Sequence, residues 1–542
     1  MSNRNTFFSL LFPEGRAELE NQQPVFFGDL QMEGILKAVL SRYSEFDLRK
    51  YFYTLPGSVS TICYRQDVYR DLEKNDFLIL IFKKFSDRMA QSEKCFQYYR
   101  QAEDEIKKGS YLLLACRQYL AALSLLRDSL NQADIASKGF RTLKEILDKM
   151  YAESEFMEFT GTVETVYSYM NELELTLLIS KKEIRILEEE NIDGAGVVDR
   201  IHEFMKAFGI PVQKEVPAVV ENIFPSPLET SSLETAVVDI LRRSKPEVFH
   251  ELKRFADVPF TLEDNIFLKI RNEILFYISF YEFEEQLGNA GYLLNYPGIH
   301  DKSGGSPDSG GGLEITQAYD MALAWKNRFS GEKVVKNDIC YGEGKRFLVI
   351  TGPNQGGKTT LARAVGQCVY LMLMGLKAPC QSMNSRFFER IMTHFEVEES
   401  VETGAGKLKE ELLRLKPMMQ DRSGNQRNSF VILNELFTTA TTYDARIMAQ
   451  KVMEHFQNNG CLGIYVTHIQ ELADEKKQPG VQSMVAQVDQ EDSGRRTFLI
   501  LPMEAQGLGY SDSIASKYEL EYDQMTKRIA ALDDRSENGE LA

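Results

Sequence analysis

Cysteine and histidine are scarce in this sequence. Seven Cys and six His occur among 542 residues. The cysteines lie far apart, no two of them form a C-x-x-C pair, and no His-rich segment accompanies them. A disulfide framework or a zinc ribbon needs pairs at short spacing, so this pattern disfavours both classes and predicts a reducing, cytoplasmic setting.

An excess of positive charge is also lacking. Lys and Arg number 63 against 80 Asp and Glu, which gives a formal net charge of -17. This excludes a chain-wide basic surface that holds nucleic acid through its overall field, so any nucleic-acid contact must be local. The apolar fraction of 43% is ordinary for a folded protein.

Long apolar runs are missing as well. The N-terminal stretch is broken by Pro13 and is too short for an export signal. The longest apolar run, residues 365–376, covers about 12 residues where a bilayer span needs about 20. We therefore expect no membrane span and a cytoplasmic protein.

A glycine-rich stretch divides the chain. Residues 301–312 are mostly Gly, Ser and Asp and offer little to bury, which predicts a linker or long loop. We expect a mostly α-helical core and lever region at 1–300, an α/β domain at 313–530 and a polar tail at 531–542.

The two parts differ in their apolar periodicity. Apolar residues at 112–130 recur at steps of three and four, and the segments 171–191 and 263–287 show the same helical pattern. C-terminal to the glycine-rich stretch, short apolar runs alternate with amphipathic segments, as in a sheet with crossover helices. These strand-length runs are 346–351, 430–433, 462–466 and 497–501.

The strongest motif is Gly352-Pro-Asn-Gln-Gly-Gly-Lys-Thr359, which fits G-x-x-x-x-G-K-[ST] between a predicted strand and a predicted helix. In such a P-loop, glycines let backbone N–H groups point at phosphates, Lys358 reaches the terminal phosphates, and the Thr359 hydroxyl binds magnesium. The sequence therefore predicts a site for ATP and Mg²⁺. Its residues are Gly352, Pro353, Asn354, Gln355, Gly356, Gly357, Lys358, Thr359 and Thr360.

Two further strand ends carry polar residues. Asn434 stands where a magnesium-holding Asp is expected, and Glu435 follows it. An amide adds no negative charge, so we expect a weak magnesium site at Thr359 and Asn434, slow ATP hydrolysis, and Glu435 as the base that polarises water. His468 follows the next strand, where it is placed to sense the terminal phosphate.

The ordered segments GPNQGGKTT, LNELFTTATTYDA and YVTHIQELAD resemble the ATPase domain of the MutS family of DNA mismatch-repair proteins, which belongs to the ABC-type ATPases. The resemblance is specific over residues 313–520 and extends more weakly to 62–72, which is similar to the start of the family's core domain. It implies an ATPase with Glu435 as the catalytic carboxylate and His468 as the switch histidine. It also implies a homodimer, an ATP-gated clamp on DNA, whose turn at Thr441 and Thr442 reaches the partner's nucleotide.

This sequence departs from the family pattern in several places. Besides Asn434, Phe437 and Thr438 stand where Gly and Arg are usual, and Gln355 stands where Met is typical. The chain starts near the family's core domain, so we expect no module that reads a mismatch directly. The hydroxyl-rich turn also has a simpler interpretation, since Ser and Thr commonly cap helices.

Basic clusters in the helical part are the candidate DNA contacts. They comprise Lys181, Lys182 and Arg185, expected on one helix, and Arg242 with Arg243. Acidic residues flank each cluster, and such charge runs are usually solvated helix faces. Two other functions stay open: a nucleotide-gated module that holds a protein or RNA partner, which the acidic balance favours, and a structural ATP binder that lost catalysis through Asn434.

Overall fold

In the computed structural model, contacts divide the chain into two units. The first comprises Met1–Thr6, Asn75–Ile135 and Phe140–Arg271, and the second comprises Phe7–Lys74, Ala136–Gly139 and Asn272–Ala542. The structure describes residues 8–14, 18–171, 176–179, 184–187, 232–262, 265–300, 312–396, 406–420, 428–489, 496–505 and 525–526.

This division differs from the boundary expected at the glycine-rich stretch. Residues 7–74 and 272–300 belong to the unit that also contains the P-loop. Burial explains the difference, because Glu273 accepts hydrogen bonds from Ser9 Oγ at 2.7 Å and from the Leu10 N–H at 2.6 Å. Contacts between residues so far apart along the chain leave no trace in local composition.

A six-stranded sheet forms the centre of the second unit, in the order β12-β11-β6-β10-β9-β8. β11 and β12 pair antiparallel, and the other neighbours are parallel. Every residue of β6, β9 and β10 is buried, as expected for parallel strands covered on both faces. The four predicted strands are confirmed. The bounds are β6 (Phe347–Thr351), β8 (Arg390–His394), β9 (Ser429–Asn434), β10 (Leu462–Val466), β11 (Val481–Val488) and β12 (Arg496–Pro502).

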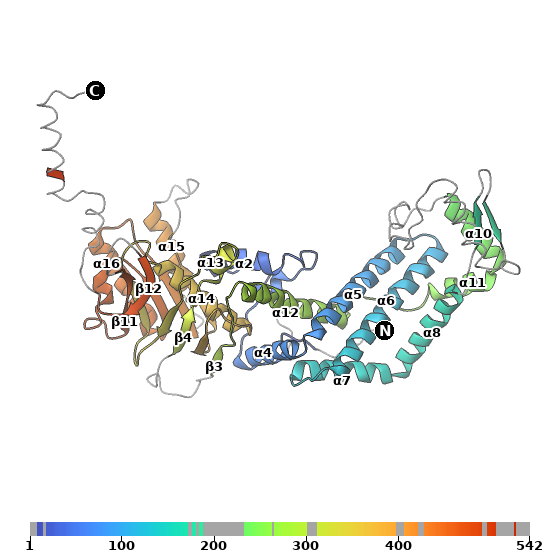
Figure 1. The fold of residues 1–542 in the computed structure, drawn as a ribbon, viewed down its shortest axis with the longest axis horizontal. Helices are drawn as coiled ribbons and strands as arrows, with labels where there is room; N and C mark the ends of the chain where they lie inside the picture. Colours follow the sequence, from blue (N-terminus) through green and yellow to red (C-terminus); the bar gives the residue numbers. More distant parts are fainter. Residues whose placement is uncertain are drawn as a thin grey trace, which may run out of the picture. The chain divides into compact units, whose positions relative to one another are not determined.

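Helices cover both faces of this sheet (Figure 1). On β9, Ile432 faces α14 (Lys358–Met374), because its Cδ1 would lie 2.7 Å from a Cβ built on Gly366. Its neighbours Val431 and Leu433 belong instead to an apolar cluster with α16 (Thr442–Asn458) and α15 (Lys407–Met419). Successive side chains of a strand point to opposite faces, so this alternation places β9 between the helices.

A four-stranded sheet and several short helices complete the second unit. The sheet order is β3 (Gly298–His300), β7 (Ser382–Arg386), β4 (Leu313–Ala318) and β5 (Asn337–Cys340). The helices are α1 (Phe26–Asp29), α2 (Met32–Val39), α3 (Arg49–Tyr53), α4 (Val59–Lys74), α13 (Met321–Asn327) and the 3₁₀ turn η3 (Gln470–Ala473).

The first unit is mostly helical. In it α5 (Phe77–Gln101) and α6 (Glu105–Gln132) lie side by side (Figure 1), and the predicted apolar stripe at 112–130 is buried on α6. The predicted helix at 263–287 is confirmed as α12 (Ile266–Asn289), which begins in this unit and continues into the second. The other helices are α7 (Lys138–Ala152), α8 (Ser154–Asn171), α10 (Ser232–Ser244) and α11 (Pro246–Phe255).

The helix expected at 171–191 is wrong. Residues Thr176–Ile179 (β1) and Ile184–Leu187 (β2) form an antiparallel pair with Thr176 opposite Leu187. Both segments are rich in Leu and β-branched residues, and short apolar runs of this kind fit a strand as well as a helix. Arg185 therefore lies on a strand, whereas Lys181 and Lys182 lie outside the described residues.

The expectation that no segment is long and apolar enough to cross a membrane needs the same correction. Among the described residues, α6 passes that test by length and composition, with a mean hydropathy of 1.2 over its most apolar window. That window is 56% buried inside the protein, where α6 packs against α5, α8 and α11. A helix buried in a protein core passes the same test, so this is weak evidence for a span.

Candidate functional site

The register of three parallel strands brings the predicted site residues together. Val466 on β10 lies opposite Ile350 on β6 and opposite Asn434 on β9. The carboxyl ends of these strands therefore meet at one edge of the sheet. The P-loop, Glu435 and His468 each begin within two residues of that line, and open α/β sheets bind ligands at this edge.

The P-loop backbone has the conformation that its glycines allow. Gly352 has a φ of 127° and Gly357 a φ of 86°, both in the region that side chains disfavour. A Cβ at Gly352 would also lie 2.9 Å from the Cβ of Ala486 on β11. Gly357 is the N-cap of α14 and has no side chain to cap the helix, so the first-turn N–H groups are free to receive an anion.

Lys358 is folded back onto the P-loop. Its Nζ donates to the carbonyl oxygens of Gly352 at 3.2 Å and Pro353 at 2.9 Å, and the residue is 5% exposed. Burial lowers the pKa of its ammonium group, and the nearby Glu435 counteracts this shift. Phosphate oxygens would replace weak carbonyl partners with stronger, charge-assisted ones.

Thr359 and Asn434 form the predicted metal-site pair. The Thr359 hydroxyl donates to Asn434 Oδ1 at 3.0 Å, which joins the P-loop helix to the end of β9. A hydroxyl and an amide oxygen fit Mg²⁺, which prefers oxygen ligands and usually keeps several waters. The pair carries no negative charge, so the donor set fits a weakly held ion.

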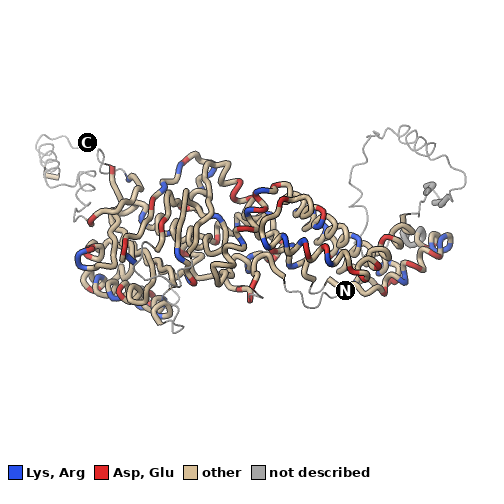
Figure 2. Tube along the Cα trace, turned by 90° about the horizontal axis from the view of Figure 1, so that it is seen from below, with Lys and Arg blue, Asp and Glu red and all other residues tan. Residues whose placement is uncertain are grey.

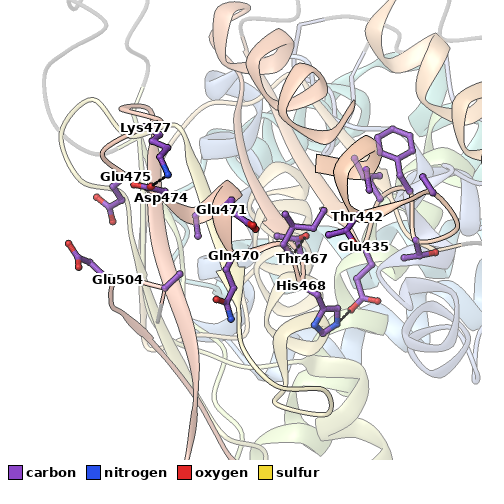
Figure 3. Close-up of a pocket in the computed structure, with 18 of the residues that line it drawn as sticks. Glu435, Thr442, Thr467, His468, Gln470, Glu471, Asp474, Glu475, Lys477 and Glu504 are labelled. Atoms are coloured by element: carbon purple, nitrogen blue, oxygen red, sulfur yellow. Dashed lines mark hydrogen bonds and ion pairs between the residues drawn. The ribbon is translucent and has the colours of Figure 1, made fainter. Parts of the chain in front are cut away.

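Glu435 and His468 lie side by side across two strand ends (Figure 3). His468 Nε2 and Glu435 Oε1 are 3.2 Å apart, and the Glu435 side chain is 23% exposed. The hydrogen bond from His468 lowers the pKa of Glu435 and outweighs the effect of burial. Glu435 itself has a φ of 54°, which is uncommon for a residue with a side chain and often marks a functional position.

Two cavities meet at Glu435. One of about 920 Å³ is lined by most of the P-loop, from Asn354 to Thr360, and extends towards β5 and α13. This volume suits a nucleotide-sized ligand. The other, of about 830 Å³, is lined by Thr442, His468 and the acidic residues Glu471, Asp474, Glu475 and Glu504 (Figure 3). Glu435 lines both, so it forms part of the wall between them.

The hydroxyl-rich turn has a structural task. Thr441 is the N-cap of α16, where its Oγ1 accepts from the Asp444 N–H at 3.2 Å, as the simpler interpretation predicted. Thr442 lines the second cavity rather than the P-loop cavity. Phe437 has a φ of 60° at the position where the MutS pattern has glycine, so the turn keeps the left-handed conformation despite the bulky side chain.

Sequence reasoning missed one residue of the site, Phe498 on β12. It lines the P-loop cavity although its sequence pattern suggested only a strand. A Cβ at Gly357 would lie 3.5 Å from its Cδ1. No local signal could have found it, because an aromatic residue in a strand is most often part of a core.

The candidate DNA contacts are less clearly defined. Arg242 and Arg243 lie in the last turn of α10 and are exposed. Lys, Arg, Asp and Glu are interspersed along the described trace rather than sorted by sign (Figure 2). The described surface therefore offers local cationic positions and fits the expectation that any nucleic-acid contact is local.

Known proteins resemble the region that forms this site. Residues 348–507 match the family described as MutS domain V. The chain is 31% identical over 153 residues to the DNA mismatch repair protein MSH2 of Saccharomyces cerevisiae, a match that covers 28% of this chain and 16% of that protein. It is 32% identical over 161 residues to the DNA mismatch repair protein MutS of Thermotoga maritima, covering 30% and 20%. A longer match, 22% identical over 352 residues, joins it to MutS of Shouchella clausii and covers 62% and 39%. The matched part thus spans well under half the length of each of these relatives.

Proposed function

The chain belongs to the MutS family, and from this premise we propose that its P-loop site binds ATP with Mg²⁺ and hydrolyses it slowly. The observation that carries the proposal is the meeting of Lys358, the Thr359–Asn434 pair and the Glu435–His468 pair at one edge of the sheet. Proteins of the MutS family are ATPases in general, and these are the residue types that phosphoryl transfer requires.

Each side chain has a defined task in this mechanism. Lys358 leaves the P-loop carbonyls and binds the terminal phosphates, while the first-turn N–H groups of α14 hold the other phosphate oxygens. Glu435 orients the attacking water and accepts its proton, and His468 keeps Glu435 in the carboxylate form. Bound Mg²⁺ supplies positive charge at the phosphates, and Thr359 and Asn434 would hold it.

Hydrolysis is proposed to be slow because of Asn434. A neutral amide at this position stabilises a divalent ion less than a carboxylate does, because the charge–charge attraction is missing. The rest of the site supports turnover, since Glu435 lies between the P-loop cavity and His468.

We further propose that two copies of the chain form an ATP-gated clamp on DNA. The relatives carry the name DNA mismatch repair protein, which supports a role in DNA mismatch repair or related DNA metabolism. Thr441 and Thr442 are the proposed contacts to the partner's nucleotide, and the helices of the first unit, with Arg242 and Arg243, are the proposed arms.

A direct test measures nucleotide and DNA binding together. ATP binding and hydrolysis are compared for the unaltered chain, Lys358→Ala and Glu435→Gln, and gel shifts use branched, mismatched and homoduplex DNA with and without ATP. We expect Lys358→Ala to lose ATP binding and Glu435→Gln to bind ATP without turnover. Wild-type turnover in Glu435→Gln would contradict the assigned role of Glu435.

A second candidate function rests on the net charge of -17. Under this alternative the site gates the capture of a protein or RNA partner rather than DNA. The gel shifts separate the two, because ATP-dependent retention of any of the DNA forms supports the clamp, and retention of RNA alone supports the alternative.

A further inference from the structure

Phe498 has a strained backbone at the mouth of the P-loop cavity. Its φ of 59° lies in the left-handed region, which a bulky residue seldom adopts and which costs free energy. It lies on β12, whose pairing with β11 shifts register between Ala486 and Val488. A strained residue persists only where surrounding contacts hold it, so these contacts are informative.

Asn337 on β5 holds this part of β12 in place. Its Nδ2 donates to the Phe498 carbonyl at 3.1 Å, and its Oδ1 accepts from the Ile500 N–H at 2.7 Å. One amide thereby satisfies two backbone groups on either side of Leu499, as a neighbouring strand would. The Thr497 hydroxyl adds a bond to the Gln487 carbonyl at 2.9 Å. These bonds fix the backbone of Phe498 and offset its strain.

The position of Phe498 points to a ligand rather than to a core. Its side chain packs against Gly357, lines the cavity together with Asn337, and is 46% exposed. Tyr319 is the other aromatic residue among the described lining, but it is 1% exposed, and its ring lies 5.3 Å from that of Tyr292. An apolar ring held in a strained conformation and left open to the cavity indicates a contact surface.

We propose that Phe498 is the platform on which the base of a bound nucleotide stacks, with Asn337 as its positioning residue. This inference deepens the proposed ATP site and rests on it. A nucleotide whose phosphates lie on the P-loop extends into the part of the cavity between Gly357 and Asn337, where Phe498 lies. Stacking uses the π face that every base has, so this contact adds affinity without selecting between adenine and guanine.

The test is a series of substitutions at one position in the full chain, with ATP affinity measured by calorimetry. We expect Phe498→Trp to bind ATP at least as well as the unaltered chain, and Phe498→Leu and Phe498→Ala to bind roughly 5- to 100-fold more weakly, the usual loss for a stacked base. Phe498→Leu keeps an apolar side chain against Gly357, so it separates stacking from simple support of the P-loop. ATP binding by Phe498→Leu equal to that of the unaltered chain would overturn the inference.

Asn337→Ala supplies the second arm. It should weaken ATP binding in the unaltered background and have no further effect in Phe498→Ala, because it acts through the position of Phe498. Equal losses in both backgrounds would overturn the positioning role. Thermal melts check that each variant is folded. If the unaltered chain binds no ATP, the proposed function fails and this inference fails with it, whereas ATP binding that is insensitive to Phe498 overturns this inference alone.

Discussion

Glu435 and His468 follow two different strands, yet their side chains lie 3.2 Å apart and share a hydrogen bond. The Glu435 N–H also donates to the Val466 carbonyl at 2.9 Å, so the backbone after β9 is tied to the end of β10. Both groups are thereby fixed before any ligand arrives, which is how a catalytic carboxylate gains its orientation. The pair also sets the charge state of Glu435, because its pKa is lowered chiefly by the bond from His468.

The first prediction concerns the acid limb of ATP hydrolysis. Glu435 works as a carboxylate, and its pKa lies below the usual value, so activity persists as pH falls until the lowered pKa is reached. In His468→Ala the donor is gone, the pKa of Glu435 rises, and the acid limb moves to higher pH. The pH profile of the turnover number measures this. His455→Ala on α16 is the matched control and leaves the limb in place, and an unmoved limb in His468→Ala would contradict the assignment.

The second prediction restores the missing carboxylate. Asn434→Asp keeps an oxygen that accepts the bond from Thr359, so the geometry is retained while a negative charge is added. Asn434 is 6% exposed, so that charge should lower the melting temperature without Mg²⁺ and raise the gain that Mg²⁺ with ATP gives. We expect Mg²⁺ to half-saturate turnover at a concentration roughly tenfold lower or less, and turnover to rise.

The outcome separates two explanations of slow hydrolysis. A rise in turnover with tighter Mg²⁺ dependence shows that the amide limits the site. Unchanged Mg²⁺ dependence, with Asn434→Ala behaving like the unaltered chain, would show that this position does not contact the metal ion.

Much of the ATP site could be predicted from sequence because its signals are local. The apolar runs that became β6, β9 and β10 are fully buried parallel strands, and the P-loop follows β6 without a gap. The polar residues at the strand ends meet because parallel strands share an edge. Such patterns are short and are fixed by burial on both faces.

The features that sequence reasoning missed depend on contacts between distant residues. Glu273 and Ser9 are 264 positions apart, and their hydrogen bond helps to place residues 7–74 beside the P-loop domain. Phe498 became a cavity residue through its bond to Asn337, 161 positions away. The β1–β2 pair was misassigned for another reason, since a short apolar run fits both periods.

The third prediction tests Arg242 and Arg243 as DNA contacts. If both neutralise a phosphate, the double alanine variant should weaken binding to every DNA form and reduce the slope of log affinity against log salt by about one unit per lost contact. Filter binding at several salt concentrations measures this slope. Lys476 and Lys477, 84% and 75% exposed in the second unit, form the control pair, whose replacement should leave the slope unchanged. The same slope in both double variants would exclude the two arginines.

The last prediction concerns Arg65 on α4, which caps the far end of the P-loop helix. Its Nη1 donates to the Met374 carbonyl at 3.2 Å and its Nε to the Leu11 carbonyl at 2.9 Å. The residue is fully buried, with the guanidinium 4.7 Å from the centre of the Phe12 ring. Burial lowers its pKa to about 10, so the side chain still carries its charge at neutral pH. α14 is therefore held at its C-terminus by a charged group from a helix more than 300 positions away in the sequence.

Arg65→Met keeps much of the apolar volume but removes the charge and both donors. We expect the variant to lose about 3 kcal/mol of unfolding free energy, because two buried carbonyls lose their partners and Glu273 loses a nearby cation. Arg70→Met on the same helix is the matched control. Its guanidinium is 48% exposed and pairs with Asp67, so its loss should cost less than about 1 kcal/mol. Thermal melts of the full chain compare the two, and hydrogen exchange at the last turn of α14 should rise in Arg65→Met alone. Equal melting temperatures for both variants would show that the buried guanidinium does not stabilise the P-loop helix.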